Sequence, residues 1–97
     1  MIIIKNQNIV FRRIHDSSFL INISDNYYND KCALYEINDT GMFIWNSIDG
    51  IRSIAEIAVL LKQEIIDDID YQIIYNDVVD FVGCLLNKHF VEVRQYE

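Results

Sequence analysis

The sequence predicts an α+β domain: a three-stranded antiparallel meander within about residues 9–37, followed by three helices within about residues 39–88. Three observations support this. β-prone runs separated by turn residues fill the N-terminal third, the hydrophobic period changes at Asn38, and helix-cap residues punctuate the rest. With 97 residues, of which 52% are hydrophobic, we expect a single domain spanning residues 1–97 with one core.

The predicted strands are three runs rich in β-branched and aromatic residues. They occupy residues 9–14, 19–23 and 31–37. The turn-rich tetrad 15–18 and the polar segment 24–30 connect them, and such short connections favour antiparallel pairing in chain order. Residues 90–94 alternate in polarity and predict a short final strand.

The first two helices are predicted from their start and stop signals. Residues 38–40 supply caps for the first, and Gly50 suits the left-handed position that follows a helix. The second helix begins at a capping box formed by Ser53 and Glu56 and runs to about Glu64. Trp45, in the first helix, is expected to be a core residue.

A third, longer helix is predicted from about Asp70 to Lys88, with charges at both ends that suit the helix dipole. Its apolar stripe recurs at intervals of three and four residues and consists of Ile74, Val78, Phe81, Val82 and Leu85. A meander followed by a short second and a long third helix has the outline of a winged helix-turn-helix.

The charge balance argues against nucleic acids and membranes as partners. There are 15 acidic and 8 basic side chains, a net charge of -7, whereas phosphate binding depends on Lys and Arg. The third helix would read DNA in a winged helix, yet it has no basic residue before Lys88. DNA binding is therefore the less favoured alternative. The three apolar residues after Met1 are too few for a signal peptide or a membrane span, so a cytoplasmic location is predicted.

No residue pattern predicts catalysis, a cofactor or a metal. His15 and Ser17 are too close in sequence for a catalytic triad. Cys32, Cys84, His15 and His89 would form a metal site only if the fold gathered them. We expect instead two buried free thiols, no cofactor and no enzymatic activity.

An ordered set of residues between Ile37 and Leu85 matches the pattern of a known family. It comprises Asn38, Thr40, Gly41, Ile44, Trp45, Asp49, Gly50, Ser53, Ile54, Glu56, Ile57, Asp77, Val78, Phe81 and Leu85. In this set the chain resembles the PqqD-like family, also called precursor-peptide recognition elements (RREs) of ribosomally made peptide natural products (RiPPs). The resemblance covers about half of the chain.

The resemblance implies a peptide chaperone. Such a protein holds the leader segment of a precursor peptide while a separate enzyme, such as a radical SAM enzyme, a protease or a cyclase, modifies the core. The leader is expected to add as an extra strand to the third strand, with side chains in the groove beside the third helix. Because the chain starts with Met1 and ends soon after the last predicted element, we expect it to be free-standing.

Two sets of residues are candidates for peptide binding. An open edge strand offers unpaired backbone groups, which predicts Cys32, Ala33, Leu34, Tyr35 and Glu36. The third helix contributes Tyr71, Ile74, Tyr75, Val78 and Val82, whereas Phe81 and Leu85 are expected in the core. Asp77 and Asp80 are candidate partners for basic leader residues. The sequence does not decide which face of the third strand is buried.

The main alternative is an adaptor or oligomerisation module without a peptide ligand. The same open edge can pair with a second copy, so a homodimer stays open as a possibility. Titration with a leader peptide separates this alternative from the peptide-binding hypothesis.

Overall fold

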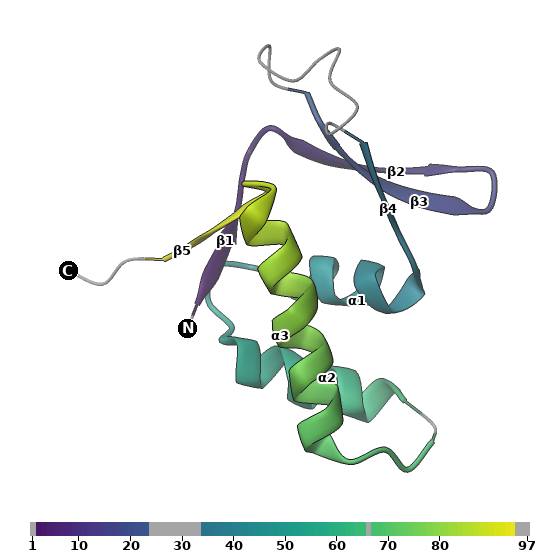
Figure 1. Ribbon diagram of the computed structural model, residues 1–97, viewed down its shortest axis with the longest axis vertical. Coiled ribbons are helices and arrows are strands. Elements are labelled where there is room, and N and C mark those ends of the chain that lie inside the picture. Colours follow the sequence, from purple (N-terminus) through teal and green to yellow (C-terminus); the bar gives the residue numbers. More distant parts are fainter. Residues whose placement is uncertain (1, 24–33, 66, 95–97) are drawn as a thin grey trace.

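The protein folds into two small antiparallel sheets and three helices (Figure 1), in a computed structural model that describes residues 2–23, 34–65 and 67–94. One sheet contains β2 (Ile9–Ile14), β3 (Ser17–Asn22) and β4 (Leu34–Ile37) in that order, and the other pairs β1 (Ile3–Lys5) with β5 (Val91–Val93). The helices are α1 (Asp39–Ser47), α2 (Ile54–Glu64) and α3 (Tyr71–Asn87).

The β2–β3–β4 sheet confirms the predicted meander. β2 pairs with β3 from Ile9↔Asn22 to Ile14↔Ser17, and β3 pairs with β4 from Ser18↔Ile37 to Ile21↔Leu34. The first part of the predicted third strand, with Cys32 and Ala33, lies outside the described residues. The meander followed by three helices is compatible with a winged helix-turn-helix.

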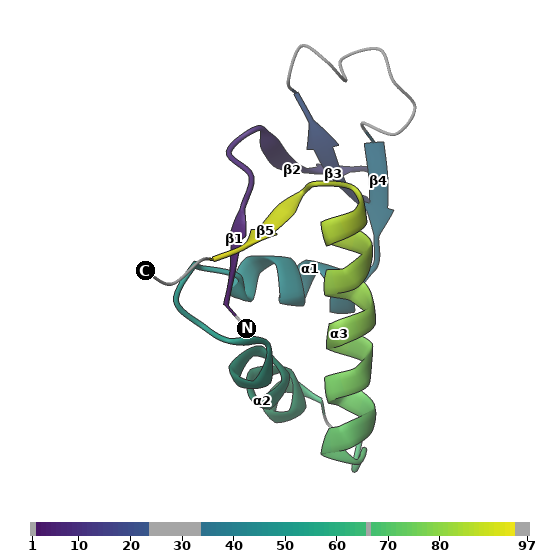
Figure 2. The same cartoon turned by 60° about the vertical axis from the view of Figure 1, so that its left-hand side comes forward.

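Of the β1–β5 pair the sequence predicts only β5, because it predicts no strand before residue 9. Ile3 lies opposite Val93, and the Arg94 amide donates to the Ile2 carbonyl at 2.8 Å. The Asn6 side-chain amide also donates to the His89 carbonyl, at 3.0 Å. Figures 1 and 2 both show β1 and β5 next to each other. This pair ties the N-terminal segment to the end of α3.

Side-chain caps start all three helices where the sequence predicts. The Asn38 side chain accepts from the Gly41 amide at 2.8 Å, and Asp70 accepts from the Gln72 amide at 2.8 Å. In the capping box, the Glu56 amide donates to the Ser53 hydroxyl at 3.2 Å, and the Ser53 amide donates to the Glu56 carboxylate at 3.1 Å. Each contact satisfies an amide that the helix leaves unpaired.

The end of α1 differs from the prediction. The helix stops at Ser47 with Ile48 as its C-cap, so Gly50 is not the residue that follows the cap. Gly50 does adopt a left-handed conformation, with φ of 78°, but within the next turn. There the Asp49 carboxylate accepts from the Ile51 and Arg52 amides at 2.9 and 2.8 Å. The side chain of Asp49 therefore shapes a separate turn between α1 and α2.

The end of α3 forms a Schellman motif on a residue that is not glycine. His89 has φ of 60°, its amide donates to the Leu86 carbonyl at 3.1 Å, and the Phe90 amide donates to the Leu85 carbonyl at 2.9 Å. Phe90 and Leu85 are both buried, which supplies the usual apolar contact of this motif. The motif turns the chain directly into β5.

The core joins one face of the meander to the helices. Leu20 and Ile37 of the sheet belong to the same buried cluster as Ile44, Val78 and Leu85 of the helices. Trp45 is buried as predicted, and the Lys5 ammonium lies 4.7 Å from the centre of its ring. The expectation of a buried thiol is wrong for Cys84, which is exposed, and Cys32 lies outside the described residues.

The capping box gives a stability prediction. Ser53→Ala removes the acceptor for the Glu56 amide, so the free energy of unfolding should fall by about 1 kcal/mol. Urea denaturation followed by Trp45 fluorescence measures this change. Glu56→Gln keeps a side chain able to accept from the Ser53 amide and should cost less. An equal loss in both variants would contradict the assigned role of Ser53.

Candidate functional site

Strand β4 presents two different faces. Ile37 is buried and Tyr35 half-buried against the core, whereas Leu34 and Glu36 are exposed on the opposite face. This settles the question that the sequence leaves open. Within the described residues, β4 pairs only with β3, so its other edge is open. Backbone N–H and C=O groups along that edge are free to bond a further strand.

Tyr35 connects β4 to the C-terminal half of α3. Its ring stacks on Phe81 with centroids 6.5 Å apart, and it meets Phe90 edge-on at 6.3 Å. The Lys88 ammonium lies over the same ring, 4.9 Å from its centre. Figure 2 shows β4 beside this part of the helix. We call the strip between Tyr35 on β4 and Asp77, Phe81 and Lys88 on α3 the β4–α3 groove.

The groove continues into a cavity of about 340 Å³ at the start of α1. Its lining comes from α1 with its N-cap residue and from α3, and consists of Asn38, Thr40, Gly41, Ile44, Asp77 and Phe81. A Cβ on Gly41 would lie 3.1 Å from the Phe81 ring and 3.2 Å from Ile37 Cβ, so glycine allows α1 to approach closely here. The absence of a side chain at position 41 thus leaves room for the Phe81 ring at its place in the groove.

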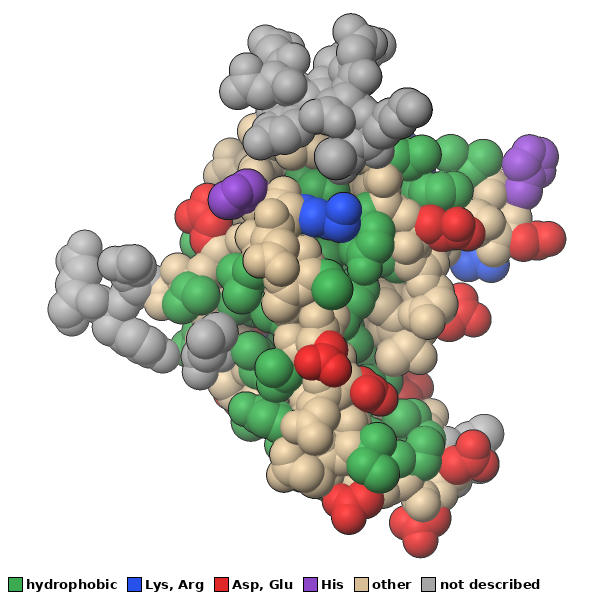
Figure 3. Space-filling model, in the orientation of Figure 1, with side chains coloured by type: hydrophobic (Ala, Val, Ile, Leu, Met, Phe, Trp, Pro, Cys, Tyr) green, Lys and Arg blue, Asp and Glu red, His purple; other side chains and the backbone are tan. Residues whose placement is uncertain are grey.

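The two ends of the groove carry opposite charges. Lys88 stands at the end next to Tyr35, and Asp77 lines the cavity at the other end. Lys88 follows Asp77 by eleven residues, which is close to three full helical turns, so both lie on one face of α3. Figure 3 views this side of the molecule, with a basic group near the C-terminal end of α3 and acidic groups further down the helix.

The structure shows where the residues predicted on α3 lie. Ile74, Val78 and Val82 are buried in the core, with 3%, 0% and 1% of their surface exposed, and Val82 also lines a cavity beside α2. Tyr71 and Tyr75 lie toward α2, where the Tyr71 hydroxyl donates to the Ala55 carbonyl at 3.3 Å. None of these five residues forms the strip beside Tyr35.

Phe81, predicted in the core, is only partly buried and takes their place in the groove together with Lys88. Of the two predicted charge partners, Asp77 lines the cavity, and Asp80 is exposed on the neighbouring helix surface. The spacing of Asp77, Phe81 and Lys88 on one helical face is the sequence signal that identifies this strip.

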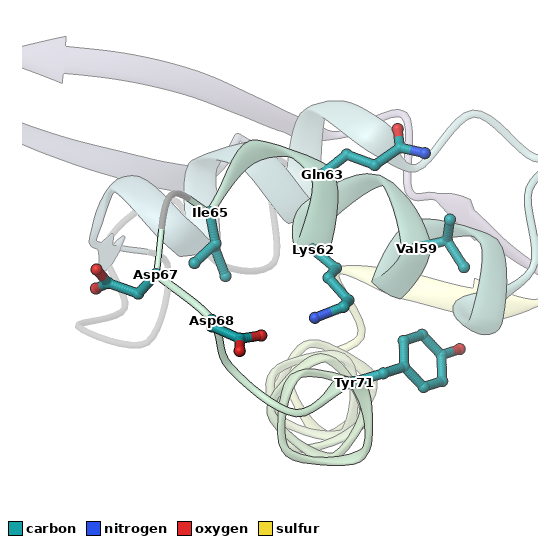
Figure 4. A pocket seen from close by; sticks show the side chains of 7 residues that line it. All are labelled: Val59, Lys62, Gln63, Ile65, Asp67, Asp68 and Tyr71. Carbon is teal, nitrogen blue, oxygen red and sulfur yellow. The ribbon is translucent and has the colours of Figure 1, made fainter.

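A larger cavity, of about 520 Å³, lies between the end of α2 and the start of α3 (Figure 4). Its lining consists of Val59, Lys62, Gln63, Ile65, Asp67, Asp68 and Tyr71. The Lys62 ammonium donates to the Ile69 carbonyl at 2.6 Å, so this lysine holds the connector between the two helices. The contact gives Lys62 a structural role.

Metal binding and membrane insertion find no support in the described part of the chain. Among the described residues, no group of three His, Cys, Asp or Glu side chains is placed to hold a metal ion. Over the same residues, no helix is long and apolar enough to cross a membrane.

The pKa of Tyr35 gives a prediction for this site. Burial, and then the nearby Cys84, raise its pKa above the ordinary value of 10.0. The folded state therefore favours the neutral phenol, and this ring should oppose unfolding less as the pH rises from about 10 through the folded pKa. Tyrosine ¹³Cζ shifts should show Tyr35 ionising at higher pH than an exposed tyrosine. Cys84→Ser should lower the pKa of Tyr35, and an unchanged titration would contradict the coupling.

Comparisons with known proteins place this geometry in a family. A model of the family described as "Coenzyme PQQ synthesis protein D (PqqD)" matches residues 27–91. Among solved structures, "TbiB1 in Complex with the TbiA(beta) Leader Peptide" matches with a TM-score of 0.71 and 19% identity, over 96% of this chain and 99% of the compared chain. At that identity the likeness shows a shared fold. Curated protein sequences contain no significant match. Because the family match covers well over half of the 97 residues, the chain belongs to the PqqD family.

Proposed function

We propose that this protein binds the leader of a ribosomally made precursor peptide by strand addition to β4 and presents it to a separate modifying enzyme. The observation that carries the proposal is the open edge of β4 beside the β4–α3 groove. Membership of the PqqD family supports it, as does the shared fold with TbiB1, which was solved in complex with a leader peptide. The chemistry belongs to the partner enzyme, and the protein acts in the cytoplasm as a recognition module.

Strand addition divides the binding energy between backbone and side chains. Each new ladder hydrogen bond contributes about 0.5–1.5 kcal/mol net and sets the register, whatever the leader sequence. Every second residue of β4 directs its N–H and C=O to the open edge, so these bonds come from alternate residues within Leu34, Tyr35 and Glu36. We propose that Cys32 and Ala33, which lie outside the described residues, continue the same role as in the sequence hypothesis. One or two apolar leader side chains, at about 1.5–3 kcal/mol each, pack on the Tyr35 and Phe81 rings. After the costs of association, a complex of about micromolar affinity is expected.

The charged ends of the groove give the leader a direction. Because the sheet is antiparallel, a guest strand antiparallel to β4 enters near Asp77 and leaves near Lys88. The eleven residues between these two correspond to about 16 Å of helix, or about five residues of extended peptide. A well-matched leader therefore has a basic residue about five positions before an acidic one. Asp80, exposed beside the groove, is a further partner for a basic residue.

The groove is tested with the leader of a precursor peptide, chosen by looking for a short precursor gene beside this protein's gene. Phe81→Ala removes an apolar surface and should weaken leader binding by about tenfold or more, measured by calorimetry. Val79→Ala is the matched control, since Val79 lies on the same helix but lines a cavity beside α2. It should change the affinity by less than about twofold. Equal losses in both variants, or amide shifts confined to residues away from β4 and α3, would exclude the groove.

The direction is tested by reversing its charges. Asp77→Lys should weaken binding of a leader whose basic residue comes first, by a few-fold because the pair is exposed to solvent. Replacing that basic leader residue with Glu should restore affinity to the Asp77→Lys variant, and Lys88→Glu should respond only to the acidic leader residue. If Asp77→Lys responded instead to the acidic leader residue, and Lys88→Glu to the basic one, the guest strand would run parallel to β4.

A further inference from the structure

The meander has a second face, which the helices do not use. Side chains alternate along its strands, and the set that points away from the core comprises Val10, Arg12, Ile14, Ser17, Phe19, Ile21, Leu34 and Glu36. We call it the outer face. Phe11 and Tyr35, neighbours on the other side of the sheet, pack against the core, whereas Val10, Phe19 and Ile21 do not belong to it. Leu34 is 50% exposed.

The strand register arranges six of these residues into two rows that cross all three strands. Val10, Ile21 and Leu34 lie opposite one another across the three strands and form an apolar row. The next row is formed by Arg12, Phe19 and Glu36. Phe19 thus has a basic residue on one neighbouring strand and an acidic residue on the other, and each of these strands lies about 4.8 Å from β3.

These two charges have no ion-pair partner within the described residues. The ion pair found there joins Arg52 and Asp49, and the Arg12 guanidinium donates only to its neighbour's carbonyl, that of Phe11, at 2.9 Å. Arg12 and Glu36 stand on the outer strands with β3 between them, about 10 Å apart. An aromatic ring flanked by unpaired opposite charges is a surface that can complement itself.

We propose that the outer face associates with the outer face of a second copy of this chain. If the two-fold axis lies along the strands, Phe19 packs on Phe19 of the second copy and each Arg12 faces a Glu36. In the apolar row, Val10 meets Leu34 and Ile21 meets Ile21 under the same rotation. An axis across the strands would instead place Arg12 on Arg12 and Glu36 on Glu36. Charge complementarity therefore selects one symmetric dimer.

The dimer leaves the groove accessible, because Tyr35 faces the opposite side of the sheet from Leu34 and Glu36. It also leaves the β4 edge unpaired, because the sheets stack on their faces. The inference does not rest on the proposed function, and a dimer of this kind would hold two leaders. Three short strands make a small interface, so the association should be weak and depend on concentration.

Charge reversal across the interface tests the proposal. Arg12→Glu places two acidic groups on each outer face, and Glu36→Arg places two basic groups there, so each variant alone should lose the dimer. Mixing the two variants pairs acidic with basic groups at both contacts and should restore a heterodimer. Arg13→Glu is the matched control, because Arg13 lies on the other side of β2, near the Ser18 hydroxyl at 3.5 Å. It should dimerise like the original chain.

Sedimentation velocity between about 10 µM and 1 mM measures the equilibrium, and circular dichroism verifies that each variant is folded. The proposal is overturned if the unmodified chain stays monomeric over this range. It is also overturned if both charge reversals dimerise as well as Arg13→Glu, or if their mixture does not associate. Leader binding by Arg12→Glu, measured separately, should match the unmodified chain, so a failed dimer and a failed peptide site are told apart.

Discussion

The contact between Tyr35 and the end of α3 is the constraint on which the site depends. A four-residue edge strand hydrogen-bonded on one side has little stability of its own. Packing of its inward side chains on Phe81 and Phe90 fixes β4 against the helix without using its free backbone edge. The protein can therefore keep an ordered strand edge open, a feature that most sheets protect or cover.

The rest of the fold holds α3 at the angle which this contact requires. Gly41 lets α1 approach Phe81 closely, and the Schellman turn at His89 sends the chain from the helix into β5. β5 is in turn fixed by β1, so the two extremes of the chain meet behind the helix that forms one wall of the groove. The glycine contact, the turn at the end of the helix and the β1–β5 pair thus all help to position α3.

Local signals were sufficient for much of this architecture. The caps at Asn38, Ser53 and Asp70 set the helix starts, and the β-prone runs set β2 and β3, because such contacts lie within a few residues. β1 was missed because its partner lies almost ninety residues away and three residues show no period. The apolar stripe of α3 predicts which side is buried, but it does not show which neighbouring side meets a strand. Phe81 sits at that boundary.

The pairing of β1 with β5 has a practical consequence for anyone who handles this protein. It brings residues 2 and 94 together at one corner, and both views of the ribbon place that corner on the opposite side of the molecule from β4. An affinity handle, a fluorophore or an anchoring surface attached at either terminus would project away from the open strand. A short linker could equally close the backbone into a ring, which would restrict the unfolded chain without touching the groove.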